Sequence, residues 1–420
     1  MKVLVVGGGG REHAIVWKLS QSPKIDRIYC APGNPGIAEL AECVSISISD
    51  IEKLAEFAKK EQIELTFVGP EEPLLHGIVN HFKQQGLTIF GPTREAALIE
   101  GSKAFAKELM MKYRIPTAKY ASFTNYEEAL AYVRTTGAPI VIKADGLAAG
   151  KGVVVAQTVT EAEEALKTMM EEAAFGSAGA RVVVEEFLEG EEMTLLAFVD
   201  GTTVKPMVPA QDHKPVYNGD QGPNTGGMGT YAPLPQVNPS MVERIVREIV
   251  EPTAKAMVEE GRSFEGILYT GLMLTREGPK VIEYNARFGD PETQVVLPLL
   301  ETDLLDIFIA GLSKGLENME VKWKDKSAVC VVMSSAGYPG PYDKGNVIQG
   351  LDQISYPTIV FHAGTTKKDG ELISYGGRVL GITSIGDTLQ EARDLAYGAI
   401  EKISFEGAHY RTDIGSKALR

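Results

Sequence analysis

One stretch, residues 138–155, constrains the fold of this chain most, because an apolar strand, a glycine-rich loop and a second apolar strand follow one another in it. It reads APIVIKADGLAAGKGVVV, and the β-branched residues at its two ends are typical of buried strands. Lys143 ends the first strand, where a buried ammonium group needs a partner. Between the strands, Gly146, Gly150 and Gly152 leave the backbone free to approach a ligand and to present N–H groups to it.

This loop has the composition of a phosphate-binding loop without the Walker spacing. Lys143 and Lys151 offer two ammonium groups, which suit the phosphates of a nucleotide. The Walker pattern needs a glycine five residues before Gly150, where Asp145 stands, and it needs Ser or Thr where Gly152 follows the second lysine. An ordinary hairpin with a solvated lysine has the same pattern, so the stretch alone leaves both interpretations open.

The charge and composition exclude several classes of partner. A formal net charge of −14 argues against nucleic acid and against anionic membranes, both of which attract basic surfaces. A small anionic substrate needs only a local positive site. The three cysteines lie far apart without metal or redox spacing, and no apolar run reaches membrane-spanning length. With 420 residues, the chain is expected to be a multidomain cytoplasmic protein.

The N-terminus has the strand–glycine–helix order of nucleotide-binding α/β folds, with a strand at residues 2–6, glycines at 7–10 and a helix at 11–19. It fails as a dinucleotide fingerprint, because Glu12 or His13 stands where the third glycine belongs. A substrate anion site or a tight turn remains. Strands and helices then alternate to about residue 90, which predicts a small doubly wound parallel sheet. Glu71 follows one strand and suits either a ribose or a helix N-terminus.

The middle of the chain carries two further candidate sites. A helix at residues 100–113 carries Lys103, Thr124 and Glu127 are expected to cap the next helix, and residues 123–186 read as a compact α+β lobe. At its end, the sequence EEFL at 185–188 suits an adenine-binding hinge, although solvated glutamates have the same pattern. Residues 211–231 are rich in glycine and predict a long irregular loop of functional importance.

A predicted strand near residue 283 ends in polar groups. Glu283 and Asn285 are two residues apart and so share one face of that strand, where a carboxylate and an amide oxygen suit Mg²⁺ bound to phosphates. Arg287 and Asp290 follow at once. From about residue 327 the chain is strand-rich and closes with an amphipathic helix that begins at Thr388.

These motifs together resemble the phosphoribosylamine–glycine ligase family of the ATP-grasp superfamily, over essentially the whole chain. The matching stretches are GGREHA at 9–14, GPE at 69–71, EGSKAFAK at 100–107, KADGLAAGKGV at 143–153, QDHK at 211–214, GPNTGGMG at 222–229, NARFGDPETQ at 285–294, FHAGT at 361–365 and GGRVL at 376–380. The resemblance implies that glycine attacks ATP to give glycyl phosphate, from which the amine of 5-phosphoribosylamine displaces phosphate.

The resemblance also implies which residues bind each molecule. Those expected to bind ATP are Lys103 and Lys143 at the phosphates, Gly146, Gly150, Lys151 and Gly152 in the closing loop, Glu185, Glu186 and Leu188 at adenine, and Glu191 or preferably Glu192 at the ribose. Those expected to hold glycine and 5-phosphoribosylamine are Gly9, Gly10, Glu71, Asp212, Lys214, Asn224, Thr225, Gly226, Gly227 and Arg287. Glu283 and Asn285 are expected to bind Mg²⁺ or Mn²⁺, while Arg287, Lys143 and Asp290 serve the phosphoryl transfer.

Three departures from the family pattern stand out. Members often read GNGG or GKGG where residues 7–10 are all glycine, and many have arginine where Pro215 follows QDHK. This puts in doubt a cationic role at that position and the transfer of substrate contacts around Lys214. Many ATP-grasp enzymes also place an acidic metal ligand on the preceding strand, where this chain has Leu272 and Met273.

The expected architecture is α/β and α+β in several domains: an N-terminal doubly wound parallel sheet (1–101), ATP-grasp lobes (102–326) with a mobile lid lobe at about 123–186, and a small strand-rich C-terminal domain (327–420). A monomer without nucleic-acid or membrane partners is expected, since no exposed apolar helix face stands out. The nearest alternative function is another ATP-grasp ligase with a different acid or amine. A nucleotide-binding regulator without turnover is opposed by the intact Glu283, Asn285 and Arg287.

Overall fold

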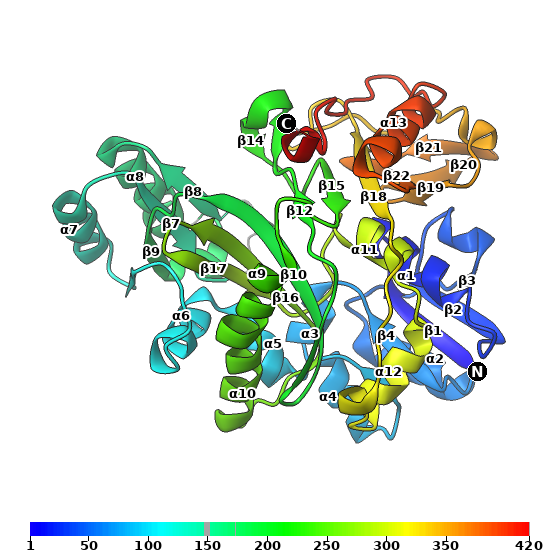
Figure 1. The fold of residues 1–420 in the computed structure, drawn as a ribbon, viewed down its shortest axis with the longest axis horizontal. Coiled ribbons are helices and arrows are strands. Elements are labelled where there is room, and N and C mark those ends of the chain that lie inside the picture. Colours follow the sequence, from blue (N-terminus) through cyan, green and yellow to red (C-terminus); the bar gives the residue numbers. More distant parts are fainter. Residues whose placement is uncertain (147–151, 173, 420) are drawn as a thin grey trace.

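The computed structural model describes residues 1–146, 152–172 and 174–419, and it confirms the expected mixture of α/β and α+β units (Figure 1). At the N-terminus, all strands of a five-stranded sheet run parallel in the order β3-β2-β1-β4-β5. These strands are β1 (Lys2–Gly7), β2 (Arg27–Pro32), β3 (Glu42–Cys43), β4 (Leu65–Val68) and β5 (Ile89–Phe90). The helices among them are α1 (Gly10–Leu19), α2 (Ile51–Lys60), α3 (Glu71–Leu75) and α4 (Ile78–Gln84).

A four-stranded antiparallel sheet, in the order β11-β10-β16-β17, forms the centre of the molecule. It is built from β10 (Glu191–Asp200), β11 (Thr203–Pro206), β16 (Glu265–Thr275) and β17 (Gly278–Asn285), and it packs against α9 (Pro239–Ile245) and α10 (Glu251–Glu259). Because β17 ends at Asn285, the polar residues that follow it emerge at the edge facing the N-terminal sheet.

The lid lobe, residues 123–186, projects from one end of the molecule and has its own hydrophobic core (Figure 1). Its antiparallel sheet has the order β6-β9-β7-β8, with β6 (Tyr120–Phe123), β7 (Ile140–Ala144), β8 (Val153–Ala156) and β9 (Val182–Glu186). Two helices, α7 (Tyr126–Thr136) and α8 (Val159–Leu166), cover it. The strand–loop–strand unit expected around Lys143 is therefore present as the antiparallel pair β7–β8.

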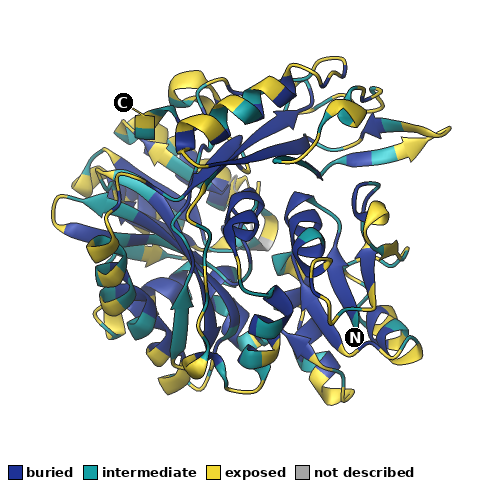
Figure 2. Cartoon of the chain, turned by 45° about the vertical axis from the view of Figure 1, so that its right-hand side comes forward, coloured by how far each residue is buried: buried dark blue, intermediate teal, exposed yellow. Residues whose placement is uncertain are grey.

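A second five-stranded sheet, in the order β12-β15-β18-β22-β19, forms the C-terminal part and packs against α13 (Leu389–Ile400). Its strands are β12 (Gln211–Asp212), β15 (Gly229–Ala232), β18 (Ser327–Ser334), β19 (Thr358–His362) and β22 (Arg378–Gly386). Two hairpins extend from this part: β13 (Pro215–Tyr217) with β14 (Gln221–Asn224), and β20 (Thr365–Lys368) with β21 (Glu371–Ser374). In Figure 2 the strands of both large sheets are buried, and the outer faces of the helices are exposed.

Three expectations about local structure were wrong. The helix expected at 100–113 is present as α6 (Lys103–Lys112) but begins later, because Ser102 is extended and caps it with its hydroxyl. Glu100 and Gly101 belong to the preceding helix, α5 (Arg94–Gly101). The helix of the lid lobe begins one residue later than expected, since the Asn125 side chain caps it. Residues 211–231 are not an irregular loop but four short strands, of which β15 hydrogen-bonds to β18.

Two further helices complete the core: α11 (Thr293–Leu299) packs on α1, and α12 (Leu304–Leu312) packs on β10 and β16. Among the residues that the structure describes, no helix is both long and apolar enough to cross a membrane.

A buried histidine pair, His13 on α1 and His362 on β19, joins the N-terminal and C-terminal parts. The Nδ1 of His13 accepts a hydrogen bond of 2.8 Å from the backbone N–H of His362. An acceptor nitrogen cannot carry a proton, so His13 is neutral in the fold. Burial lowers the pKa of His13 to about 3, and burial lowers that of His362 to about 4.

Because of this pair, we expect the folded protein to lose stability at acidic pH. Unfolded histidine titrates near pH 6.5, whereas the buried rings stay neutral to lower pH. As the pH is lowered from 6.5 to 4, protons therefore bind the unfolded chain only, and the free energy of unfolding decreases. We expect each buried histidine to lower the free energy of unfolding by about 2 kcal/mol between pH 7.5 and pH 5. Denaturant titrations at both pH values measure this, and His13→Asn, which retains an acceptor, should lose less on acidification. The exposed His76→Asn is the control; equal pH dependence in both variants would contradict the assignment.

Candidate active site

A cavity of about 670 Å³ lies where the N-terminal sheet, the central sheet, the lid lobe and the C-terminal part meet. Most of the site residues expected from the sequence line it. These are Glu71, Lys103, Lys143, Gly152, Glu185, Glu186, Leu188, Glu192, Asp212, Lys214, Asn224, Thr225, Gly226, Glu283, Asn285, Arg287 and Asp290. Gly9, Gly10, Gly146 and Gly227 do not line it, and Gly150 and Lys151 lie outside the described residues.

The lysine of the β7–β8 unit is buried and paired. Lys143 Nζ lies 2.9 Å from Glu185 Oε1 and donates to the backbone carbonyl of Ile282 at 3.0 Å. Because Ile282 is in β17, this contact joins the lid lobe to the central sheet beside Glu283. The solvated interpretation is therefore wrong for both Lys143 and Glu185, while Glu186 is exposed.

The start of α6 joins the second phosphate candidate, Lys103, to the glycine loop. Asp145 accepts hydrogen bonds from the Ser102 hydroxyl at 3.0 Å and from the Ala104 backbone N–H at 2.8 Å. Lys103 Nζ donates to the carbonyl of Gly146 at 3.1 Å. Burial lowers the pKa of Lys103, and the neighbouring Lys143 lowers it further. Two cations thus lie close together in the cavity, a position that favours an anionic ligand.

Lys214 connects two carboxylates that the sequence assigned to different ligands. Its Nζ lies 2.5 Å from Glu192 Oε1 and 3.9 Å from Glu283 Oε1. Burial alone would raise the pKa of Glu283, but the charges of Lys214, Lys143 and Lys103 hold it below its usual range. Glu283 is therefore ionised near neutral pH.

Glu283 and Asn285 fit a divalent cation that also binds phosphate. Both lie on β17 and line the same cavity. Within the described part of the chain no group of three or more His, Cys, Asp or Glu side chains could hold a metal ion. One ionised carboxylate and one amide oxygen, with substrate phosphates and water as the other ligands, match the way Mg²⁺ is usually bound.

Arg287 lies at the centre of an ion-pair network that the sequence did not reveal. Its guanidinium is 3.1 Å from Glu71 and 2.9 Å from the buried Glu100, and it donates to Asn285 Oδ1 and to the Phe288 carbonyl. Three of its five N–H groups donate hydrogen bonds to described residues, and the contact with Glu100 is an ion pair. Glu71 is thus paired with Arg287, which retains an N–H group on Nη1 for a ligand.

Asp290 joins the same cavity to α1 and to the C-terminal sheet. Its carboxylate accepts hydrogen bonds from the Arg11 backbone N–H at 3.3 Å and from Gln294 at 2.9 Å, and Arg378 lies 3.4 Å away. Burial would raise the pKa of Asp290, but Arg378 and Arg11 lower it overall. Arg378 also donates to the Gly226 carbonyl at 2.7 Å, so it fixes the glycine-rich segment beside Asp290.

The remaining expected substrate residues serve local structure as well. Gly9 donates its N–H to Glu12 Oε2 at 2.7 Å, at the start of α1. A Cβ on Gly10 would lie 2.7 Å from Gln294, which explains glycine there. The Thr225 hydroxyl donates to the Lys214 carbonyl and accepts from the Gly227 N–H, so this loop folds back on β13.

Asp212, like Glu100 and Glu292, is a carboxyl group of the cavity whose pKa is raised. Burial raises the pKa of Asp212 well above its usual range, and the nearby Glu292 raises it further. Glu292 is itself buried and accepts a hydrogen bond from Tyr269 at 3.0 Å. Lys214 opposes the upward shift in the pKa of Asp212, and a cationic group of a ligand beside Asp212 would lower this pKa in the same way.

Several residues of the site were missed from the sequence: Arg11, Glu100, Lys107, Tyr269 and Arg378, all of which line the cavity. A usable signal existed for two of them. Lys107 is one helical turn after Lys103, so the two lysines share a helix face. Arg378 follows the glycines at 376–377, which the sequence interpretation took as a turn.

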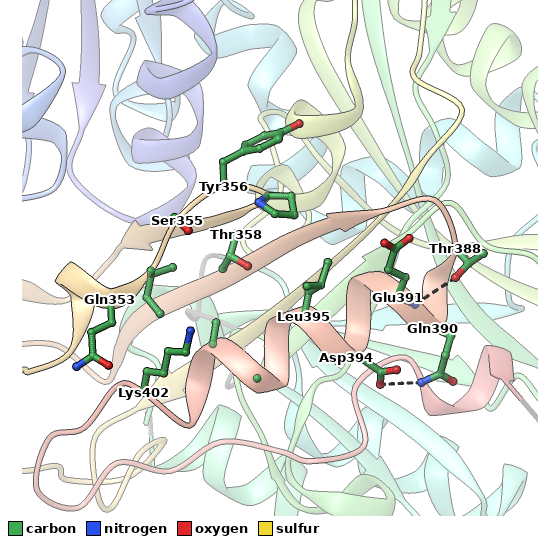
Figure 3. A pocket seen from close by; sticks show the side chains of 14 residues that line it. Gln353, Ser355, Tyr356, Thr358, Thr388, Gln390, Glu391, Asp394, Leu395 and Lys402 are labelled. Carbon is green, nitrogen blue, oxygen red and sulfur yellow. Dashed lines mark hydrogen bonds between the residues drawn. The ribbon is translucent and has the colours of Figure 1, made fainter.

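A second hollow, of about 810 Å³, lies in the C-terminal part between α13 and the segment before β19 (Figure 3). Its side chains are engaged with one another: Thr388 caps α13 through the Glu391 N–H, and Asp394 accepts from Gln390 at 2.7 Å. None of the expected site residues lines it. The concentration of charged groups, and not size, therefore marks the 670 Å³ cavity as the functional site.

Comparison with known proteins identifies the family to which the chain is similar. Three family models match: the N domain of phosphoribosylglycinamide synthetase at 1–100, its ATP-grasp (A) domain at 101–293 and its C domain at 328–417. The phosphoribosylamine–glycine ligase of Caldanaerobacter subterraneus subsp. tengcongensis is 55% identical over 416 residues, which cover 99% of this chain and 100% of the relative.

Solved structures agree. The crystal structure of phosphoribosylamine–glycine ligase from Thermotoga maritima has a TM-score of 0.86 at 35% identity, covering 99% of this chain and 100% of that one. The biotin carboxylase domain of Hydrogenobacter thermophilus 2-oxoglutarate carboxylase, solved with MgADP and bicarbonate, has a TM-score of 0.75 at 17% identity over 97% of this chain and 91% of its own. The second likeness concerns the fold alone.

Proposed function

Because the chain belongs to the phosphoribosylglycinamide synthetase family, we propose that it catalyses the ATP-dependent ligation of glycine to 5-phosphoribosylamine. The products are glycinamide ribonucleotide, ADP and phosphate, in de novo purine biosynthesis. The observation that carries the proposal is the meeting, in one cavity, of Lys103 and the buried Lys143 with the Glu283–Asn285 pair. Such a site can bind a nucleotide triphosphate and its metal ion together.

The reaction has two steps. A carboxylate oxygen of glycine attacks the γ-phosphorus of ATP, so glycyl phosphate forms and ADP leaves. The amine of 5-phosphoribosylamine then attacks the glycyl carbonyl, loses a proton and expels phosphate. Neither step needs a covalent enzyme intermediate, so the protein acts by positioning the reactants and neutralising charge.

For the nucleotide, we assign Lys103 and Lys143 to the phosphates, with Gly146, Gly150, Lys151 and Gly152 over them. Glu185, Glu186 and Leu188 lie where the lid lobe meets the central sheet and are assigned to adenine, and Glu192 to the ribose. Binding in this mode requires Lys214 to release Glu192, to which it is 2.5 Å away.

The metal ion would be held by Glu283 and Asn285, and when bound it supplies positive charge that polarises the transferred phosphoryl group. Mg²⁺ or Mn²⁺ suits these oxygen ligands. Arg287 offers its free Nη1 hydrogen to the transferred group, while Glu71 and Glu100 fix its plane. Asp290, ionised between Arg11 and Arg378, positions α1 against the cavity.

For the substrates, Asp212 suits the ammonium group of glycine, because it is a cavity-lining carboxyl group near the acidic Glu292, where a further cation is favourable. Gly9, Gly10, Lys214 and the segment Asn224, Thr225, Gly226 and Gly227 are assigned to 5-phosphoribosylamine and glycine jointly. The net charge of −14 supports action without nucleic acid or a membrane. A monomer is proposed, and the three free cysteines accord with a reducing compartment such as the cytoplasm.

One experiment separates this reaction from ligation of another acid or amine. ADP release is measured with ATP and Mg²⁺ after adding glycine alone, freshly generated 5-phosphoribosylamine alone, or both. We expect release, and formation of the amide, only with both. If ATP binds but no ADP is released even with both compounds present, these substrates are contradicted and a related ligase is favoured.

A further inference from the structure

Three buried ionisable side chains meet at the floor of the cavity: Lys107, Lys143 and Glu185. Lys107 Nζ lies 3.0 Å from Glu185 Oε2, and Lys143 Nζ lies 2.9 Å from Glu185 Oε1. The side chains of Lys107 and Glu185 are 2% and 5% exposed, so water screens this cluster little. One carboxylate therefore serves two ammonium groups, and the cluster carries a net positive charge.

Backbone geometry brings the cluster together. Lys143 on β7 pairs with Val183 on β9, and Glu185 lies two residues further along β9, so its side chain is on the same face. Lys107 comes from α6, which places it on the opposite side of the same carboxylate. No local sequence pattern links the three residues.

The two lysines are engaged to different degrees. Around Lys107 Nζ lie three oxygens, from Glu185, from the Thr117 hydroxyl at 2.8 Å and from the Ala118 carbonyl at 3.5 Å. The Thr117 hydroxyl in turn donates to the Val281 carbonyl of β17 at 2.7 Å. An ammonium group has three N–H donors, so Lys107 has none left for a ligand.

Lys143 is held less completely. Its Nζ has two oxygen neighbours among the described residues, Glu185 Oε1 and the Ile282 carbonyl. Two oxygen neighbours leave one of its three N–H donors for a ligand. Lys143 also has fewer contacts to give up than Lys107 when it moves away from Glu185.

We propose that Lys107 is a positioning residue of the nucleotide site, which keeps Glu185 paired so that Lys143 is free to bind the phosphates of ATP. A buried carboxylate without a partner is costly. If Lys143 were the only cation on Glu185, moving it to a phosphate would leave that carboxylate unpaired. Lys107 removes this cost because its own contacts do not change. The inference rests on the proposed ATP-dependent function.

Burial lowers the pKa of Lys107 to about 8, although Glu185 acts to raise it. Near neutral pH the group is thus still largely charged, as the pairing requires. The cation also lies 5.7 Å from the centre of the Tyr120 ring, a further favourable contact.

The test compares nucleotide binding by Lys107→Met and the wild type, using calorimetry with ATP, ADP and adenosine. We expect the dissociation constants of ATP and ADP to rise about ten-fold, the scale of one charged hydrogen bond, with that of adenosine unchanged. The KM for ATP should rise more than kcat falls. Lys107→Arg keeps a cation and should recover most of the affinity. The control is Lys112→Met, an exposed lysine on the same helix.

Each outcome decides a separate question. Unchanged ATP affinity in Lys107→Met would overturn the role of Lys107. Equal losses for ATP and adenosine would overturn it too, because they would indicate a structural role. If Lys107→Met does not fold, Lys107→Arg and the double variant Lys107→Met/Glu185→Gln, which removes both partners, supply the comparison. Wild-type protein that binds neither ATP nor ADP would instead overturn the proposed function and this inference with it.

Discussion

Replacing Glu283 by glutamine is expected to lower the rate of ADP release with glycine and 5-phosphoribosylamine by about a hundred- to a thousand-fold. Glutamine keeps the shape of the side chain and removes its negative charge. Glu283 is the ionised member of the Glu283–Asn285 pair, and no cluster of three acidic or other metal-binding side chains among the described residues could replace it. The loss should therefore fall on metal-dependent phosphoryl transfer.

A measurement besides activity locates the effect. Electron paramagnetic resonance of Mn²⁺ in the presence of ATP should show a bound ion in the wild type and a weaker signal of the bound ion in Glu283→Gln. The control is Glu277→Gln, an exposed glutamate in the turn between β16 and β17 whose partner is Lys280. A near-normal rate in Glu283→Gln, with Mn²⁺ still bound, would refute the assignment of the metal site.

Replacing Arg287 by methionine is expected to lower the free energy of unfolding by about 3 kcal/mol at pH 8, in addition to abolishing turnover. Arg287 compensates two carboxylates, Glu71 at 3.1 Å and Glu100 at 2.9 Å. Glu100 is 4% exposed and accepts a hydrogen bond from the Ala286 N–H. Without the guanidinium, a buried charge would remain without its partner.

The pH dependence of this loss has a definite sign. Burial already raises the pKa of Glu100 above its usual value, even though Arg287 acts to lower it. In Arg287→Met this pKa rises further, so the folded chain binds a proton more readily than the unfolded chain. The destabilisation should then be smaller at pH 5 than at pH 8. Denaturant titrations at both values measure it.

Two further variants make the comparison specific. Arg287→Met/Glu100→Gln removes both members of the buried pair and should recover part of the stability, because no unpaired charge remains. Arg244→Met removes an exposed arginine that pairs with Glu248, where the expected change is below about 1 kcal/mol. Equal stability of Arg287→Met and the wild type at pH 8 would contradict the network.

Local sequence patterns predicted much of the fold. The alternation of apolar strands and helices predicted the parallel N-terminal sheet, and the apolar runs around Lys143 predicted the β7–β8 pair. These patterns succeed for β1, β4 and β7 because a strand buried on both faces must be apolar along most of its length, whereas β8 is an edge strand with Val155 exposed. The predicted element boundaries were wrong where contacts with a neighbouring element determine where a helix begins or ends. Ser102 divides α5 from α6, for instance, with Asp145 of the lid lobe bound at the start of α6.

The sequence by itself determined the fold class, the family and many of the polar residues that line the cavity, since glycines, lysines and the Glu-x-Asn pair follow from chemistry along the chain. Only the tertiary structure decided which charged side chains pair with one another in the cavity. It joined Arg287 to Glu71 and Glu100, and Lys107 to Glu185, from segments up to 216 residues apart. The physical reason is that the state of a buried charge depends on whatever group lies within a few ångströms, and local periodicity does not encode that neighbour.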